Sequence, residues 1–84
     1  MKKRYIDGVV PDEMIEARSL IASQLRAARM SANLTQQGLA ELCSTKKSNI
    51  SRMESGRYNP SLDFLVKVAS SMGMEVSIQV GQPE

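Results

Sequence analysis

The sequence predicts a mainly α-helical domain of four to five helices, followed by one short C-terminal β-strand. Through residues 12–72, apolar residues recur at steps of three and four, which is the period of a helix with one buried face. From residue 74 the pattern changes to strict alternation of apolar and polar residues, which is typical of a strand. The 84 residues are enough for one domain with a small core.

The composition argues against several classes of protein. The single cysteine, Cys43, cannot form an internal disulfide, and the absence of histidine excludes a conventional zinc site, so we expect no metal and no cofactor. We expect Cys43 to be a small core residue. No carboxylate pair accompanies a glycine-rich phosphate loop, so we expect no enzyme. The chain has neither an apolar run of about 18 residues nor a signal peptide, which predicts a cytoplasmic protein without a membrane partner.

The first elements are an arm and a long helix. Residues 1–11 lack a helical period, and we expect a disordered, solubilising arm rather than one that enters a DNA minor groove. Residues 12–32 predict one long helix, or two helices with a break near Ser19. Asn33 follows as a left-handed terminator. The expected inward-facing residues of this helix are Met14, Arg18, Ile21, Leu25, Ala28 and Ala32.

Two short helices come next. Thr35 is placed to cap a helix that ends near Leu42. Helical spacing returns in residues 46–54, and Gly56 is the expected residue just beyond the end of that helix. The expected buried residues of the two helices are Leu39, Ala40, Cys43, Ile50 and Met53. Two short helices joined by three or four residues, with flanking helices that carry apolar stripes, predict a helix-turn-helix.

The last helix and the predicted strand follow the turn "YNPS". Ser61 can cap the helix, and Gly73 ends it. The expected apolar stripe of this helix consists of Leu62, Leu65, Val66, Ala69 and Met72. The strand then places four apolar side chains on one side, namely Met74, Val76, Ile78 and Val80.

Positive charge is concentrated in residues 44–60, although the net charge of the whole chain is only +2. The charged residues of this stretch are Lys46, Lys47, Arg52, Arg57 and the single acid Glu54. Composition alone leaves two interpretations open, a solvated charged face and a surface for a negatively charged partner such as nucleic acid. The predicted helix-turn-helix favours the second interpretation.

At this point the sequence resembles the Cro/CI-like (XRE) helix-turn-helix family. The resemblance is carried by "LTQQGLAEL", "NISRMESGRYNPSL" and "LVKVASSMGM", and it covers residues 20–74. It implies a lambda-repressor-like bundle in which residues 12–73 form the DNA-binding domain, with double-stranded DNA as the partner. In that family the second of the paired helices lies in the DNA major groove.

The resemblance also implies roles for individual residues. The base-contacting candidates are Lys46, Lys47, Ser48 and Arg52. Because lysine and arginine pair best with guanine, we expect a guanine-containing half-site. The phosphate-contacting candidates are Gln36, Asn49, Arg57, Tyr58 and Asn59. Arg29 and Glu54 match a pair that forms a partly buried ion pair between helices in several members of the family.

The turn before the second paired helix departs from the family's pattern at two positions. The family usually has glycine where Ser44 stands, so Ser44 is expected to carry strain in a left-handed conformation. It also usually has a serine or threonine cap where Lys46 stands, which leaves Thr45 to supply the cap one residue early. The first residue of the helix is therefore defined only to within one position, and either Lys46 or Lys47 is the residue that contacts a base.

The C-terminal pattern resembles antitoxins of the HigA type, small partners of ribonuclease toxins that repress their own operon. Residues 74–84 are then the expected dimerisation element, because a lone strand cannot satisfy its own backbone groups. Pairing with a second copy, with a toxin strand or with its own core remains open, and we favour the homodimer.

Two functions follow from this reading. The first is a sequence-specific regulator, expected to be a repressor that binds a palindromic operator as a dimer and to serve as the autoregulating antitoxin of a toxin protein. The alternative is a protein-interaction module that mainly neutralises a toxin, with DNA binding secondary. The contact surface for a toxin is expected on residues 12–23, the arm or the terminal strand.

Overall fold

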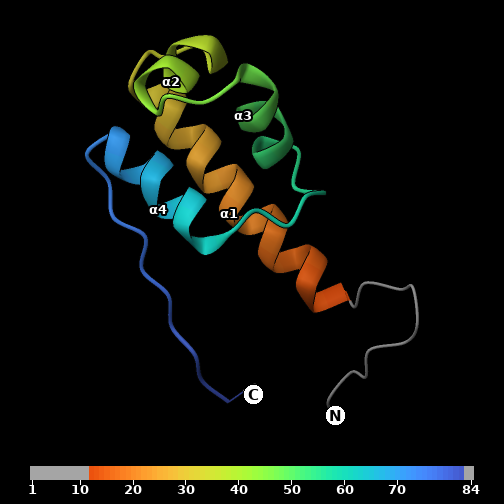
Figure 1. The fold of residues 1–84 in the computed structure, drawn as a ribbon. Coiled ribbons are helices and arrows are strands. Elements are labelled where there is room, and N and C mark those ends of the chain that lie inside the picture. The colour runs from red at the N-terminus through yellow and green to blue at the C-terminus, as the bar shows by residue number, and fades with distance from the viewer. Residues whose placement is uncertain (1–11, 83–84) are drawn as a thin grey trace.

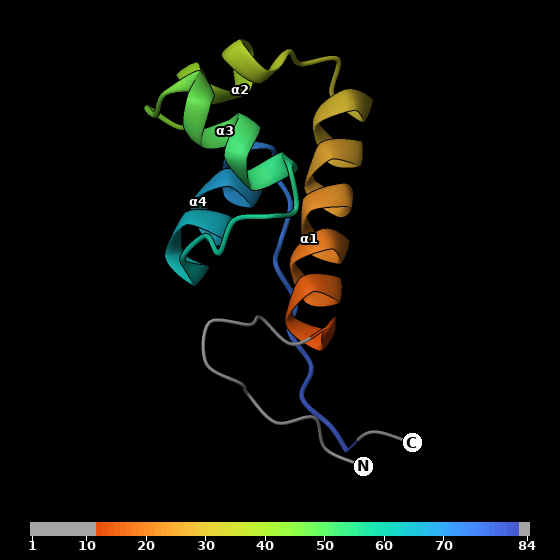
Figure 2. The same cartoon turned by 90° about the vertical axis from the view of Figure 1, so that its right-hand side faces the viewer.

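The computed structural model describes residues 12–82. It contains the helices α1 (Asp12–Ser31), α2 (Gln36–Leu42), α3 (Lys47–Glu54) and α4 (Leu62–Ser71). Helix α1 is one long, unbroken helix (Figure 1), and Figure 2 shows the other three helices packed along one side of it. The described residues therefore form the predicted mainly α-helical bundle, with four helices, while the predicted N-terminal arm lies outside them.

The core is built from one or two apolar side chains of each helix. Leu25 of α1 is 5% exposed, whereas Leu39 of α2, Ile50 of α3 and Val68 of α4 are completely buried. The remaining core members are Ala40, Cys43, Met53 and Ala69. Cys43 is buried, as predicted, and its thiol donates a hydrogen bond to the Ser71 hydroxyl at 3.3 Å.

The predicted inward faces of α1 and α4 were partly wrong. Leu62 and Val66 are 53% and 44% exposed, while Val68, which the prediction omitted, is fully buried. Six of the ten residues of α4 are apolar, so two overlapping faces satisfy the helical period, and packing against α2 selects one of them. Met14 is 42% exposed because the first turns of α1 extend beyond the other helices (Figure 2). Ala32 is also exposed, since it lies just past the end of α1.

Helices α2 and α4 begin at the predicted caps. The Thr35 hydroxyl accepts a hydrogen bond from the backbone N–H of Gly38 at 2.9 Å, and the Ser61 hydroxyl accepts one from Phe64 at 3.1 Å. Each bond satisfies a backbone donor that the helix itself cannot pair.

The start of α3, which the sequence left open by one residue, lies at Lys47, and the predicted cap from Thr45 was wrong. The N-cap residue of α3 is Lys46, which forms no side-chain cap hydrogen bond. Thr45 does not supply a cap, because its hydroxyl accepts a hydrogen bond from the Asn49 side-chain amide at 2.9 Å. Ser44 has a φ of 54°, which is the left-handed conformation expected where the family has glycine. Asn33 also has the expected left-handed conformation, with a φ of 57°.

The predicted C-terminal strand was wrong, since the structure assigns no strand within residues 12–82. After Gly73, whose φ is 71°, the chain runs back past α1 toward its N-terminal end (Figures 1 and 2). Val76 packs against the core, but Met74, Ile78 and Val80 are 48%, 63% and 92% exposed. A strand requires a neighbour for its ladder of hydrogen bonds, and a bundle of four helices has no sheet edge to offer.

At Gly56, two residues after the end of α3, the chain passes close to α1. Gly56 is buried, it has a φ of 75°, and a Cβ atom placed on it would lie 3.3 Å from the Cα atom of Ser19 in α1. Glycine is thus required at this position both for the backbone conformation and for the space.

Gly56→Ala should lower the free energy of unfolding by more than the approximately 1–3 kcal/mol typical of a left-handed non-glycine residue. Gly73→Ala is the matched control, since Gly73 has a φ of 71° but no atom within 4 Å of the added Cβ position. Urea unfolding followed by circular dichroism measures both variants. Equal losses would show that the contact with Ser19 contributes nothing.

Candidate nucleic-acid interface

Helix α3 has one face in the core and the opposite face in solvent. Ile50 and Met53 are 0% and 3% exposed. With 100° between successive residues, Ser48 and Arg52 point away from this buried side, and both are exposed. Ser51 lies beside Ser48 on the outward face and is exposed too, although it was not among the predicted contact residues. The helical period of Ile50 and Met53 was enough to find it.

The other base-contacting candidates lie at the start of α3. Lys47 is its first residue and Lys46 precedes it as the N-cap, and both side chains are exposed. The structure therefore brings Lys46, Lys47, Ser48 and Arg52 together on one helix, with their side chains outside the core.

A network of hydrogen bonds around Glu54 fixes the orientation of α3. The guanidinium of Arg29 in α1 donates from Nε to Glu54 Oε2 at 2.7 Å and from Nη2 to Oε1 at 3.0 Å. Its third nitrogen, Nη1, donates to the backbone carbonyl of Leu34 at 2.7 Å, between α1 and α2. The side chains of Arg29 and Glu54 are 12% and 3% exposed, so little water competes for these bonds.

The same carboxylate also holds α2. The Gln36 side-chain amide donates from Nε2 to Glu54 Oε1 at 3.1 Å. The hydrogen bond from Arg29 to Glu54 raises the pKa of Arg29 above its ordinary value, against the opposing effect of burial, so the guanidinium stays charged. One carboxylate of α3 thus connects Arg29 of α1 with Gln36, the first residue of α2, and Arg29 in turn holds the turn after α1 through the Leu34 carbonyl. Gln36 was predicted to contact a phosphate, and in the structure its side-chain amide is bonded to Glu54.

A cleft of about 300 Å³ lies between α3 and α4. It brings together four of the predicted contact residues, Asn49, Arg52, Tyr58 and Asn59. Lys67 of α4 also lines this cleft, and the sequence could not reveal it, because its position depends on how α4 packs against α3. The guanidinium carbon of Arg52 lies 5.1 Å from the centre of the Tyr58 ring.

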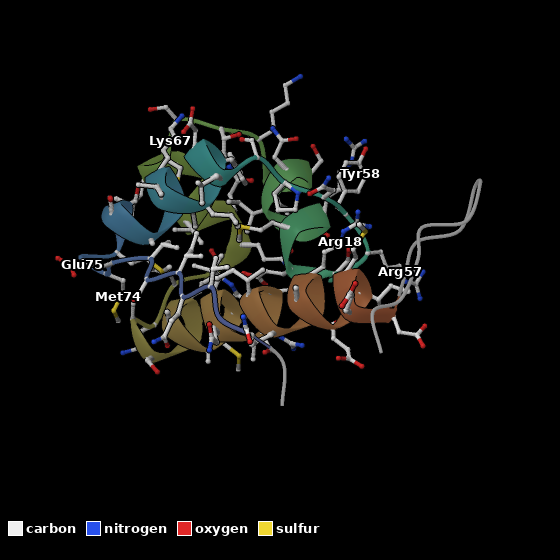
Figure 3. The ribbon with its side chains drawn as sticks, turned by 90° about the horizontal axis from the view of Figure 1, so that it is seen from below. Arg18, Arg57, Tyr58, Lys67, Met74 and Glu75 are labelled. Atoms are coloured by element: carbon white, nitrogen blue, oxygen red, sulfur yellow. The ribbon has the colours of Figure 1, made fainter. Side chains whose placement is uncertain are left out.

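The loop after α3 separates two residues that were predicted to act together. Tyr58 faces the cleft beside α4, whereas Arg57 lines a hollow on the other side with Arg18 and Ser19 of α1. Both residues lie at one end of the molecule, and Met74 and Glu75 lie at the other end (Figure 3). The predicted phosphate-contacting residues are therefore distributed around α3 and do not form one cluster.

A second hollow flanks α3 on the side of α1. Arg26, an exposed residue of α1, lines it together with Gln36 and Ser51. Arg26 was not among the predicted contact residues, since nothing in its helical period indicates which neighbour it faces. The outward face of α3 thus has a positively charged residue on each flank, Arg26 on one side and Lys67 on the other, while the one acid of α3 is paired with Arg29.

The part of the chain that the structure describes has neither a metal-binding cluster nor a membrane-spanning helix. Residues 12–82 contain no group of three or more histidine, cysteine or acidic side chains that could hold a metal ion. None of the four helices there combines the length and the apolar character that a bilayer crossing requires.

Comparison with known families identifies the fold. The family model HTH_3, described as helix-turn-helix, matches residues 25–78. The chain belongs to the HTH_3 helix-turn-helix family. This match covers the last part of α1, the paired helices α2 and α3, helix α4 and the first residues after it, and it confirms the resemblance to Cro/CI-like proteins.

One curated relative is an immunity repressor protein from Bacillus phage phi105, which is 39% identical over 62 residues. That alignment covers 74% of this chain but 43% of the repressor, so the chain spans less than half the length of this relative.

Solved structures are similar as well. An HTH_3 family transcriptional regulator from Vibrio cholerae superposes with a TM-score of 0.70 at 29% identity, over 74% of this chain and 35% of the regulator. A hypothetical transcription factor from Neisseria, NHTF, gives 0.68 at 26% identity, over 86% and 82% of the two chains. A toxin-antitoxin module from Streptococcus pneumoniae gives 0.66 at 29% identity, over 90% and 86%.

The Arg29–Glu54 pair yields a stability prediction. Arg29→Met alone should lower the free energy of unfolding by about 3–5 kcal/mol, because it leaves the buried Glu54 carboxylate without its counter-charge. Arg29→Met combined with Glu54→Leu should recover part of this loss, since two apolar side chains then replace both charges. Urea unfolding of the wild type, the two single variants and the double variant gives the coupling between the residues. If the double variant were as unstable as Arg29→Met, the pair would be required for folding itself and not only for orienting α3.

Proposed function

We propose that the chain is a sequence-specific DNA-binding transcriptional regulator whose helix α3 enters the major groove. The observation that carries this proposal is the two-sided character of α3, with Ile50 and Met53 in the core and Ser48 and Arg52 exposed opposite them. The family match and the phage repressor relative support a DNA-binding regulator rather than an enzyme. A helix of this kind fits the width of the major groove of B-DNA.

In this proposal two groups of residues contact the DNA. Lys47, Ser48 and Arg52 contact base edges, with Lys46 at the mouth of the helix, and arginine or lysine favours guanine. The second group contacts phosphates and fixes the register of α3, and the residues predicted for this role are Gln36 of α2, Asn49 of α3, and Arg57, Tyr58 and Asn59 of the following loop. Arg26 and Lys67 add positive charge on the two flanks, where the DNA backbones pass.

We further propose that the chain binds as a homodimer and acts as a repressor. A two-fold axis would place two copies of α3 about one DNA turn apart, roughly 34 Å, so that the operator is a palindrome. The exposed apolar side chains of Met74, Ile78 and Val80 are the candidates for the contact with the second copy. Figure 3 places Met74 at the end of the molecule opposite Tyr58, so a contact through Met74 would leave the DNA-binding surface open.

A second function, neutralisation of a toxin protein, is supported by the similarity to the toxin-antitoxin module from Streptococcus pneumoniae. An autoregulating antitoxin of the HigA type would combine both functions in one chain. The first half of α1 offers a surface for such a partner, because Met14, Ile15 and Leu20 are 42%, 47% and 60% exposed. Co-purification of a small basic protein encoded beside this chain would support the second function.

Selection of bound duplexes from a random pool tests the DNA-binding proposal. The expected result is a palindromic consensus with guanine in each half-site. The affinity for that consensus should fall about a thousandfold or more between 50 and 200 mM salt, because a dimer that makes about 6 to 10 phosphate contacts releases as many counterions. Enrichment of no sequence would refute the proposal, and a consensus without symmetry would refute the dimer.

Substitutions on α3 test the assignment of the base-reading residues. Lys47→Ala together with Arg52→Ala should weaken binding to the consensus by about 1–3 kcal/mol for each bidentate base contact that is lost. The matched control is Arg52→Lys, which keeps the charge but loses the planar fork of donors, so it should reduce discrimination between bases and leave the salt dependence unchanged. Fluorescence anisotropy at several salt concentrations measures both effects. Unchanged binding of the Lys47→Ala, Arg52→Ala variant would exclude α3 as the recognition helix.

A further inference from the structure

Tyr58 contacts a base-reading candidate directly. Its ring centre lies 5.1 Å from the guanidinium carbon of Arg52, within the range of a cation–π contact. Tyr58 was predicted to contact a phosphate, a role that would use its hydroxyl group. The structure instead shows its ring engaged with the one arginine on the outward face of α3.

The loop that carries Tyr58 is anchored at both ends. At its start, the Ser55 hydroxyl donates to the backbone carbonyl of Arg52 at 2.6 Å and accepts from the backbone N–H of Arg57 at 3.2 Å. Gly56 then turns the chain in a left-handed conformation while it packs against α1. At the end of the loop, Ser61 caps α4. The path of the chain therefore returns Tyr58 to α3, although the ring itself is 52% exposed.

The geometry of a guanidinium explains what this contact can do. A cation–π contact uses the charge of the guanidinium and occupies none of its N–H donors with an acceptor, so these donors stay available for hydrogen bonds. Within residues 12–82, Arg52 forms no ion pair, and the carboxylate of Glu54, the acid of the same helix, is bound to Arg29. The ring thus restricts the conformations of a long, exposed side chain without using any of its donors. Such preorganisation lowers the entropy that is lost when the arginine meets a base.

We propose that Tyr58 is a positioning residue for base recognition, whose ring holds the Arg52 guanidinium with its donor edge toward the base that Arg52 reads. This inference rests on the proposed DNA-binding function, and it assigns the effect to the ring of Tyr58 and not to its hydroxyl. Its consequence is specificity at a base pair that Tyr58 itself does not touch.

The test compares Tyr58→Phe, which keeps the ring and removes the hydroxyl, with Tyr58→Leu, which removes both. The full chain is used with the selected consensus duplex and with duplexes changed at single base pairs. The pair read by Arg52 is identified as the one at which Arg52→Ala abolishes discrimination. Tyr58→Phe should discriminate like the wild type. Tyr58→Leu should lose discrimination at that pair alone, on the order of two- to fivefold per half-site, and should have no further effect in an Arg52→Ala background.

A measurement without DNA tests the contact itself. The ring current of an aromatic side chain at this position should shift the Arg52 Hδ and Hε resonances upfield in the wild type and in Tyr58→Phe, and the shift should vanish in Tyr58→Leu. The same spectra report whether each variant is folded.

Three results would overturn the inference. An equal loss in Tyr58→Phe and Tyr58→Leu on every duplex would assign Tyr58 to a phosphate through its hydroxyl. Discrimination by Tyr58→Leu equal to the wild type would show that the ring positions nothing. If the wild type selected no sequence at all, the DNA-binding proposal would fail and the role of Tyr58 with it, even where the upfield shift showed that the contact exists.

Discussion

The arrangement of this domain depends on the ion pair between Arg29 and Glu54. Three nitrogens of one guanidinium and both oxygens of one carboxylate are used, and their partners come from α1, the turn after it, α2 and α3. Removing two charges from water costs nearly as much as their attraction returns, so such a pair adds little net stability. The pair instead fixes the orientation of α3, because hydrogen bonds are directional. The apolar contacts of Ile50 and Met53 alone would allow α3 to rotate or slide by small amounts.

The pair also decides the charge of the exposed surface. Glu54 is the only acid in α3, and its carboxylate is directed inward to Arg29 and Gln36. The lysine and arginine side chains of α3 therefore face solvent without a neighbouring acid from the same helix. A net charge of +2 for the whole chain conceals this separation, since most acids lie on other elements. In the proposed binding to DNA, the local distribution of charge, and not the total, is what attracts the polyanion.

Much of the fold could be predicted because local rules and tertiary packing agree there. Thr35 and Ser61 cap their helices through local hydrogen bonds that do not depend on the rest of the fold. In α2 and α3 the few apolar residues, such as Leu39 and Ile50, define a single inward face for each helix. The inward face of α4 could not be predicted in full, since its apolar residues fit two overlapping faces and the packing of α4 against α2 determines which of them is buried. The alternation after Gly73 suggested a strand, but alternation describes side chains and cannot supply the neighbouring backbone that a strand requires. The contact between Arg52 and Tyr58 depends on the path of a loop, which residue types alone do not determine.

Ser44 holds the turn between α2 and α3 in a left-handed conformation that costs a non-glycine residue about 1–3 kcal/mol. Backbone hydrogen bonds maintain the turn despite this cost, from Ser44 to the carbonyl of Glu41 at 3.2 Å and from Thr45 to that of Ala40 at 2.9 Å. The shape of the turn is therefore independent of its most strained side chain, which is exposed and lies outside the core. A stability reserve is thus stored one helix turn before the residues of α3 that face outward. During evolution, Ser44→Gly could remove this strain and raise the free energy of unfolding. That gain could offset the stability lost when new side chains appear on α3, so that specificity could change while the fold is retained.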